Sequence, residues 1–439
     1  MFFSTFADVL GDLNNIEMIH SLKTYLTGCF FLLATIVMAQ ERVTTINDID
    51  DTAVSLSILP ADSIVIDSVF TISWQERVKQ ELELLLQSEM FQTSQVGLMV
   101  YDLTADSVLF RHNERQLMRP ASIQKVVTSV AALDYLGSNY ELSTRLCYTG
   151  EISNGILYGD IYCVGAMDPL LSTDDLRTFA SSVKSLGIDT IRGKIIADLS
   201  MKDANRLGEG WCWDDKNPCL TPLLIDGKDV FMQRFLTQLE RASVFVDGFS
   251  VEDTLPYGAI QICQSSHTVS DVMVSMMKNS DNLFAEALFY QIASRQGGRQ
   301  STAKNAAKVI KNLIKKIGLN ADNYKIADGS GLSLYNYHTA ELEVELLKYA
   351  WKNTDIFYPL YESLPIAGVD GTLKKRMKNT KAYDNVRAKT GTVTAVSSLS
   401  GYCKASNGHK LCFCIINNGL LSTSSGRSFQ DNVCNILCE

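Results

Sequence analysis

The sequence predicts an α+β fold in which an antiparallel sheet flanked by helices is interrupted by a smaller β-rich insertion. Apolar residues at helical spacing occupy both ends of the chain, whereas short alternating runs separated by turn residues fill residues 141–266. The last part of the chain contains apolar strands followed by a closing helix. Hydrophobic residues make up 46% of the 439 residues and charged residues 20%, a composition typical of globular chains with a sizeable core.

The N-terminal 39 residues are predicted to be a signal peptide that directs export. A 15-residue apolar run at 25–39 follows Lys23 and ends in small residues, and it is shorter than the roughly 20 residues needed to span a bilayer. An uncleaved anchor or a buried helix is the alternative interpretation, and translation could begin at Met1 or Met18. Residues 40–73 are acidic and weakly periodic, so we expect them to form a leader or loose arm.

Residues 74–140 are predicted to be the first segment of the main domain. Their elements are a helix over 74–91, a hairpin of 95–103 and 107–111, and a helix over 121–136. The second helix follows Pro120, is mostly apolar and stops at Gly137, a favourable residue for a helix end.

Residues 141–266 are predicted to form the inserted β-rich domain. The expected strands are 142–148, 156–164, 191–199, 243–249 and 259–262, with one helix over 174–185. Gly, Asn and Asp residues between these runs indicate tight turns.

Residues 267–439 return to longer helices and are predicted to complete the main domain. The expected helices are 269–277, 282–294, 302–317, 341–353 and 428–437, and the expected strands are 386–389, 395–403 and 410–417. The region between 353 and 386 is expected to be a loop. Helices on both sides of the insertion indicate one domain built from two separated segments.

Charge and cysteine content exclude several classes of function. The formal net charge is −9, which gives no electrostatic support for nucleic-acid binding. The 11 cysteines form no Cys-x-x-Cys pair and histidines are scattered, so no metal site and no organic cofactor are expected. Cys212 and Cys219 could close a loop after export, whereas Cys434 and Cys438 are expected to pack as small apolar groups. Disulfide pairing and oligomeric state stay open.

Ser122 and Lys125 are the candidate nucleophile and base. A serine needs a base within hydrogen-bond reach, and residues three apart on a helix share a face. Burial lowers the pKa of a lysine, which suits the most apolar of the predicted helices. Ser-x-x-Lys by itself is weak, since it occurs at Ser122/Lys125, Ser181/Lys184, Ser275/Lys278 and Ser301/Lys304. The first match is favoured because it follows a hairpin and opens an apolar helix.

Two further motifs follow in order along the chain. In Ser280-Asp281-Asn282 the serine can relay a proton and the asparagine can hold a substrate amide, although all three residue types also cap helices. In the strand segment Lys389-Thr390-Gly391-Thr392, a lysine and two hydroxyls along an edge suit an extended peptide that ends in a carboxylate. An ordinary helix cap and an ordinary strand end are the alternative interpretations.

The ordered set Ser-x-x-Lys, Ser-Asp-Asn and Lys-Thr-Gly is the signature of penicillin-binding proteins and class A β-lactamases. Further stretches strengthen the likeness, namely 119–122, 280–286, 328–333, 364–373, 387–392 and 401–402. With them the chain resembles the D-alanyl-D-alanine carboxypeptidase/endopeptidase family, the class C type of low-molecular-mass penicillin-binding proteins, over residues 75–437. This likeness implies the penicillin-binding/β-lactamase-like transpeptidase fold. The family's larger members carry two inserted domains, whereas residues 141–266 have room for about one.

The resemblance also implies a function, a place and a mechanism. A family member cleaves peptidoglycan stem peptides in the bacterial periplasm or cell envelope and is inhibited covalently by β-lactam antibiotics. Ser122 would attack the bond between two D-Ala residues, Lys125 would take its proton, and Ser280 would pass a proton to the leaving group.

The same resemblance assigns the substrate contacts. Asn282 and the strand residues Lys389, Thr390, Gly391 and Thr392 would bind substrate. The backbone N–H groups of Ser122 and Thr392 would form the oxyanion hole.

Three alternatives are weighed against this interpretation. A class A β-lactamase needs a deacylating glutamate between the second and third motifs, and the loop 318–336 contains none. A class C β-lactamase or esterase would use a tyrosine wall, but Tyr383-Asp384-Asn385 lies too close to Lys389 to form a separate one. A non-catalytic wall-binding protein would have lost one of the motifs, and all are present.

Overall fold

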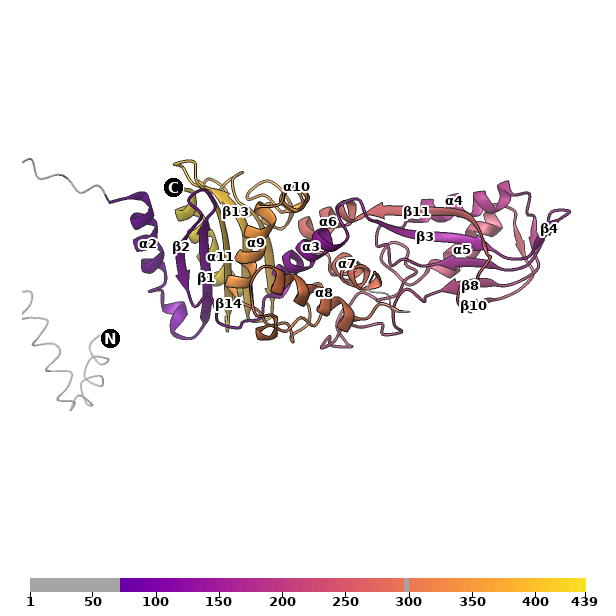
Figure 1. The fold of residues 1–439 in the computed structure, drawn as a ribbon, viewed down its shortest axis with the longest axis horizontal. Coiled ribbons are helices and arrows are strands. Elements are labelled where there is room, and N and C mark those ends of the chain that lie inside the picture. Colours follow the sequence, from indigo (N-terminus) through magenta and orange to yellow (C-terminus); the bar gives the residue numbers. More distant parts are fainter. Residues whose placement is uncertain (1–71, 296–299) are drawn as a thin grey trace, which may run out of the picture. The chain divides into compact units, whose positions relative to one another are not determined.

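The computed structural model describes residues 72–295 and 300–439 (Figure 1). The predicted signal peptide at 1–39 and nearly all of the predicted leader at 40–73 lie outside the described residues. Within the described part, no helix combines the length and the apolar character needed to cross a membrane.

The main sheet brings the two ends of the described chain together. It has five antiparallel strands in the order β12-β13-β14-β1-β2. Their bounds are β1 Gln95–Asp102, β2 Ser107–His112, β12 Arg387–Val393, β13 Val396–Lys404 and β14 Lys410–Asn418. Strand β1 pairs with β14 from Gln95↔Asn418 to Asp102↔Leu411, so residues more than 300 positions apart form the middle of one sheet. This arrangement confirms the predicted α+β fold.

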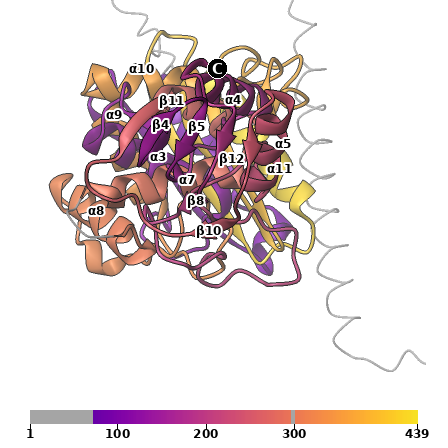
Figure 2. The same ribbon diagram turned by 90° about the vertical axis from the view of Figure 1, so that its right-hand side faces the viewer.

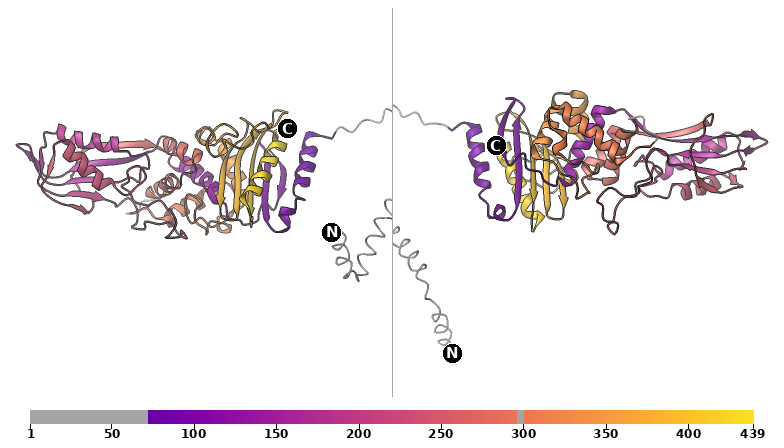
Figure 3. Two further views of the ribbon diagram at one scale, coloured as in Figure 1. Left: turned by 180° about the vertical axis from the view of Figure 1, so that it is seen from behind. Right: turned by 60° about the horizontal axis from the view of Figure 1, so that its bottom comes forward.

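Helices cover both faces of this sheet. Helices α2 (Trp74–Leu85) and α11 (Thr423–Cys438) contact each other on one face, as Figure 3 shows for the indigo and yellow helices. On the other face lie α3 (Gln124–Tyr135), α6 (Val269–Lys278), α7 (Asn282–Ser294), α8 (Ala303–Lys316), α9 (Ala340–Trp351) and α10 (Thr354–Ser363).

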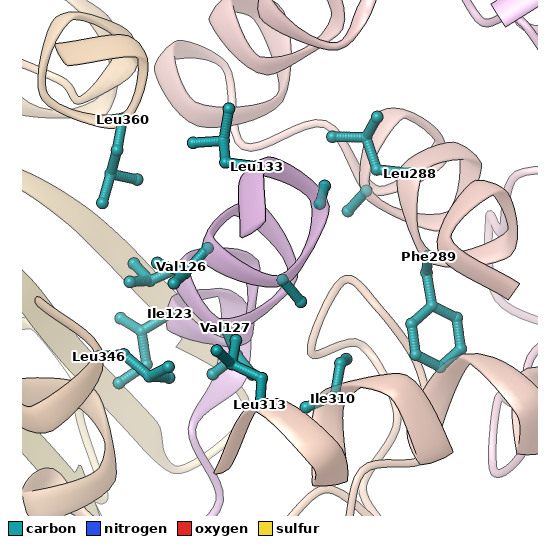
Figure 4. Close-up of a cluster of buried hydrophobic side chains, with 14 of the residues drawn as sticks. Ile123, Val126, Val127, Leu133, Leu288, Phe289, Ile310, Leu313, Leu346 and Leu360 are labelled. Atoms are coloured by element: carbon teal, nitrogen blue, oxygen red, sulfur yellow. The ribbon is translucent and has the colours of Figure 1, made fainter. Parts of the chain in front are cut away.

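Helix α3 lies in the middle of the helical layer. Its Val126, Val127 and Leu133 are buried among side chains of the neighbouring helices, including Leu346 of α9 and Leu313 of α8 (Figure 4). The helix that carries the first motif is therefore held on all sides by packing.

Residues 141–268 form two further sheets. One has the order β10-β8-β6-β3-β11 and the other β4-β5-β7-β9. Their bounds are β3 Glu141–Tyr148, β4 Glu151–Ser153, β5 Ile156–Tyr158, β6 Ile161–Val164, β7 Thr190–Ile191, β8 Ile195–Asp198, β9 Phe245–Val246, β10 Ser250–Glu252 and β11 Ile260–Thr268. Helices α4 (Thr173–Ser185) and α5 (Phe231–Arg241) pack against each other here (Figure 2).

This region has a hydrophobic cluster of its own, which includes Phe179 and Phe235. Residues 71–439 nevertheless group as one compact unit by their contacts, so the division into catalytic and inserted domains stays a prediction.

The structure corrects several predicted elements. Helix α5 was missed, although its buried residues Phe231, Phe235 and Leu239 lie at helical spacing. Helix α10 lies in the predicted loop after residue 353 and contains Pro359, a residue that argues against a helix interior. The predicted strands 156–164 and 191–199 are each split by a turn, and the predicted helix 74–91 ends at Leu85 before the short 3-10 helix η1 (Glu89–Gln92).

The cysteines behave as separate thiols in the described residues. Cys434 and Cys438 lie on the buried face of α11 within an apolar cluster, which confirms their predicted packing role. Cys212 is exposed and Cys219 is half-buried, and neither is bonded to the other.

Candidate active site

The first motif brings the candidate base into contact with the candidate nucleophile. Ser122 lies in the 3-10 turn η2 (Ala121–Ile123), and Lys125 lies in the first turn of the following α3. The Lys125 Nζ lies 3.1 Å from the Ser122 Oγ. It also donates to the Asn282 Oδ1 at 2.8 Å and to the backbone carbonyl of Ser330 at 2.8 Å. Because these two acceptors hold the Lys125 amine, its third hydrogen-bonding position points at the Ser122 Oγ.

Burial makes Lys125 a usable base. Its side chain is completely buried, and this desolvation lowers the pKa of Lys125 to about 8. The nearby carboxyl groups of Asp328 and Glu286 partly oppose the shift because they favour the charged ammonium. A neutral amine is therefore accessible near neutral pH, as a proton-accepting role requires.

The turn that presents Ser122 is strained and tightly enclosed. Ala121 has φ 52°, a left-handed conformation that is rare for a residue with a side chain. The carbonyl of the preceding Pro120 accepts a hydrogen bond from Ser398 of β13. Gly331 lies against the Ala121 carbonyl so closely that a β-carbon at position 331 would clash with it. Packing on both sides thus holds the nucleophile in place.

In the second motif, one residue caps a helix and the residue before it faces the candidate site. Asp281 is the N-cap of α7, and its side chain accepts hydrogen bonds from the N–H groups of Leu283 and Phe284. This leaves Ser280 outside the helix at φ 60°, where its Oγ lies 2.8 Å from the Lys389 Nζ. Asp281 therefore acts as a helix cap, whereas a catalytic role of the neighbouring Ser280 stays a prediction.

Lys389 belongs to the edge strand β12, and its side chain is enclosed by the protein. Its side chain is completely buried, and the Nζ donates to the Ser280 Oγ and, at 2.6 Å, to the carbonyl of Thr390. Desolvation, and then repulsion by Lys125, lower the pKa of Lys389 well below its ordinary value. The ammonium group faces the Ser280 side of the site rather than the solvent.

The rest of the third motif lines the open edge of the sheet. Thr390 is half-buried and Thr392 is exposed, on the opposite side of the strand from Lys389 and Gly391. The N–H of Ala388 donates away from β13 to the carbonyl of Pro365. Because backbone N–H groups alternate along a strand, the N–H of Thr392 points to the same open edge.

Gly391 allows the strand to approach the nucleophile. A β-carbon at position 391 would lie 2.8 Å from the Pro120 carbonyl oxygen and 3.0 Å from the Ser122 nitrogen. Strand β12 therefore lies directly against the turn η2, which places the backbone of both motifs on one side of the site.

Two buried acids shape the site without having been assigned a role from the sequence. Glu286 accepts hydrogen bonds from the N–H groups of Gly329 and Ser330, and burial raises its pKa to about 8. Asp328 accepts from the indole of Trp211 at 2.8 Å and from the N–H groups of Gly331 and Ser333. Both acids fix the loop whose Ser330 carbonyl holds Lys125. The two acids lie in the segments 280–286 and 328–333, which resemble the family. This resemblance is the sequence signal that points to them.

Thr372 is a further residue without a prediction from the sequence. Its Oγ1 lies 2.7 Å from the Oγ1 of Thr390, which donates to it. The contact joins the segment 364–373 to the third motif.

Comparisons with known proteins identify the family of this chain. The sequence profile of the D-Ala-D-Ala carboxypeptidase 3 (S13) family matches residues 78–225 and 224–439. The D-alanyl-D-alanine carboxypeptidase DacB of Haemophilus influenzae is 26% identical over 411 residues, which cover 74% of this chain and 86% of the relative. A D-alanyl-D-alanine carboxypeptidase of Actinomadura sp. is also 26% identical, over 78% of this chain and 81% of its own length.

Solved structures show the same fold. Penicillin binding protein 4 of Haemophilus influenzae superposes with a TM-score of 0.72 at 24% identity, covering 81% of this chain and 97% of that protein. A second structure of that protein holds a β-lactam, and a structure of the Bdellovibrio bacteriovorus endopeptidase Bd3459, with a TM-score of 0.53, is acylated by penicillin G. The profile match spans most of the chain. The chain therefore belongs to the D-Ala-D-Ala carboxypeptidase 3 (S13) family and is a serine-type D-Ala-D-Ala carboxypeptidase.

Proposed function

We propose that the enzyme removes the terminal D-Ala from peptidoglycan stem peptides through an acyl-enzyme formed on Ser122. One observation carries the assignment of residues. Among the Ser-x-x-Lys pairs, Ser122 and Lys125 lie 3.1 Å apart, with a buried lysine whose pKa is about 8 and with the other two motifs beside it.

Acylation begins when the neutral Lys125 accepts the proton of the Ser122 hydroxyl. The Oγ then attacks the carbonyl carbon of the penultimate D-Ala, and the carbonyl oxygen becomes an oxyanion. The N–H groups of Ser122 and Thr392 donate to this oxyanion, a contribution often worth several kcal/mol. Both groups belong to the two segments that meet at Gly391.

Collapse of this intermediate breaks the peptide bond and requires a proton on the departing amine. Ser280 donates its hydroxyl proton to the D-Ala nitrogen and is reprotonated through Lys389, which lies 2.8 Å away. The Asn282 Oδ1 is engaged by Lys125, so we assign its Nδ2 group to a carbonyl of the bound peptide. Water then attacks the ester carbonyl, and its proton passes through Ser280 to Lys389, which gave up a proton during acylation. The bond between the carbonyl carbon and the Ser122 Oγ breaks, the Oγ takes back the proton held by Lys125, and the shortened peptide is released.

Four further proposals accompany this one, and the first two follow from the same site. A β-lactam mimics the cleaved peptide bond and would leave Ser122 as a slowly hydrolysed ester, as in the acylated relatives. Cross-links that end in a D-Ala bond would be cleaved by the same steps, which gives endopeptidase activity. The predicted signal peptide would direct the enzyme to the periplasm or cell envelope. Separately, residues 141–266 are proposed as an inserted domain.

Mass spectrometry after incubation with benzylpenicillin tests the nucleophile. We expect one adduct, on the peptide that contains Ser122, and no adduct in Ser122→Ala. Ser181→Ala is the matched control because Ser181 also precedes a lysine by three residues, and it should be acylated as the wild type is. An adduct on any other residue would refute the assignment.

Nitrocefin turnover separates this function from that of a β-lactamase. We expect labelling with a fluorescent penicillin and negligible nitrocefin hydrolysis, because no loop glutamate is present to activate the deacylating water. Rapid nitrocefin hydrolysis would favour the lactamase. Lack of labelling of the wild type would favour a wall-binding protein.

A further inference from the structure

The short segment 364–373 forms one wall of the site, although the proposed mechanism gives it no task. Thr372 lies in the 3-10 turn η4 (Gly371–Leu373), and its side chain is exposed. Its hydroxyl lies 2.7 Å from the hydroxyl of Thr390, on the open side of β12. Thr372 therefore extends the line of hydroxyl groups formed by Thr390 and Thr392.

A clamp from the end of α6 fixes the position of this turn. Lys278, two residues before Ser280, pairs with Asp370 at 2.7 Å and donates to the carbonyl of Leu364 at 2.6 Å. Asp370 also accepts from the N–H of Ile366 at 2.8 Å. Both ends of the segment are thus tied to the end of α6.

Gly371 makes this close contact possible. It has φ 53°, and a β-carbon at position 371 would lie 2.7 Å from the carbonyl oxygen of Lys278. Only a glycine lets η4 approach α6 so closely while it adopts the left-handed conformation. The hydroxyl of Thr372 is consequently held at a defined place rather than on a mobile loop tip.

The carboxylate of the substrate needs donors that Lys389 is not placed to provide. The Lys389 ammonium is buried and donates to Ser280 and to the Thr390 carbonyl. The Thr390 hydroxyl donates to Thr372, whereas no hydrogen bond from the Thr372 hydroxyl to another described residue is formed. The proton of Thr372 is therefore free to reach an anionic acceptor at the edge of the strand.

Exposed lysines add to the attraction of an anion to this corner. Lys374, Lys375 and Lys378 lie two to six residues after Thr372 and are exposed, in a chain whose net charge is −9. They raise the local potential around η4 without touching the reacting atoms.

We propose that Thr372 is a specificity-determining residue that donates a hydrogen bond to the terminal carboxylate of the substrate. It acts with Thr390 and Thr392, and the assignment rests on the proposed function because it presupposes that a D-Ala carboxylate binds along β12. The Lys278–Asp370 pair is the clamp that positions it. The residue distinguishes a free C-terminal acid from an amide or from a peptide that continues.

Steady-state kinetics of Thr372→Val with two peptides test this role. One peptide ends in D-Ala-D-Ala, and the other carries the same sequence with a C-terminal amide. For the acid we expect KM to rise and kcat/KM to fall about tenfold, because a hydrogen bond to a charged group is lost. For the amide we expect kcat/KM to stay the same. Thr372→Ser should restore the preference for the acid.

Equal losses on both peptides, or no loss on either, would overturn the assignment. Thr237→Val is the matched control, since Thr237 is an exposed threonine of α5, and it should leave the preference for the acid intact.

Binding to a Ser122→Ala background separates this inference from the proposed reaction. Calorimetry with the two peptides should show that Thr372→Val removes most of the preference for the acid. If the wild type bound the acid but did not cleave it, the proposed reaction would fail while the role of Thr372 would stand. If the Ser122→Ala protein did not distinguish the acid from the amide, the role of Thr372 would be refuted.

Discussion

Lys125 and Lys389 are both completely buried, and desolvation lowers the pKa of each ammonium group. Their surroundings differ. Asp328 and Glu286 lie near Lys125 and support its charge, whereas Lys389 is further depressed by Lys125 itself. Two adjacent buried cations are unfavourable together, so the site tends to hold fewer than two positive charges near neutral pH. This coupling suits a site in which protons move between a nucleophile and a leaving group.

The rate of acylation is expected to depend on pH. Lys125 accepts a proton only when neutral, and its pKa is about 8. The second-order rate constant for benzylpenicillin should therefore rise with pH by about tenfold per unit below pH 8 and level off above it. Stopped-flow or gel measurements of acylation between about pH 6 and pH 10 check this.

The matching variant is Lys125→Ala, which should fold but show no acylation over the same range. A wild-type rate that does not change across pH 8, or a variant that is acylated normally, would remove Lys125 as the base.

At the scale of elements, the proposed active site lies where the edge strand β12 contacts the turn η2. Edge strands are open to an added extended peptide, which can pair with their free N–H and C=O groups. One side of β12 faces β13 in regular register, from Arg387↔Tyr402 to Val393↔Val396. The other side is covered near Ala388 by the segment at Pro365, and within the described part of the chain the N–H groups of Thr390 and Thr392 make no backbone hydrogen bond there. The strand thus offers a short stretch of edge beside the nucleophile.

Gly391→Ala tests this contact between elements. A β-carbon there would be within 3.0 Å of the Ser122 nitrogen and would also meet Ser398, so the turn η2 must shift. We expect acylation to slow by about a hundredfold or more, since small misplacements of reacting groups are costly, while circular dichroism stays unchanged. Val393→Ala, at the end of the same strand, is the control. Normal acylation of Gly391→Ala would show that the contact is not required.

At the scale of the whole molecule, the chain returns to the main sheet after a long excursion. In the sequence, strands β1 and β2 precede residues 141–268, and strands β12 to β14 follow them. Nevertheless, β1 pairs directly with β14. The three motifs come from residues about 110 to 270 positions apart, and they meet only when this sheet closes. Closing such long loops is slow, so we expect the site to form late in folding.

Phe235→Ala tests whether the inserted region behaves as a unit of its own. Phe235 is fully buried in the cluster of residues 146–244, and its removal should cost about 3–5 kcal/mol. Hydrogen exchange should rise within residues 141–268, and benzylpenicillin should still acylate Ser122. Phe249→Ala, at an exposed phenylalanine of the same region, should change little. Equal loss of protection in α3 would contradict a separate domain.

Much of the fold was predictable because it depends on local patterns. The hairpin of β1 and β2 and the helices α6 to α9 follow from short-range periodicity, caps and turns. Helix α5 carries the same periodic signal in Phe231, Phe235 and Leu239, whereas the proline inside α10 argues locally against a helix there. The splitting of the inserted strands depends on which neighbours they pair with, and this is not a local property.

The sequence by itself determined which residues are candidates for the reaction and the order in which they follow along the chain. Ser122 and Lys125 share a helical face because they are three residues apart, and Asp281 caps α7 because of its place before an apolar helix. Only the tertiary structure decided the burial of Lys125 and Lys389, the contact of Ser280 with Lys389, and the place of Thr372 beside Thr390. Spacing along a helix is a local property of the backbone. Desolvation and contacts between distant residues exist only after separate segments have packed together.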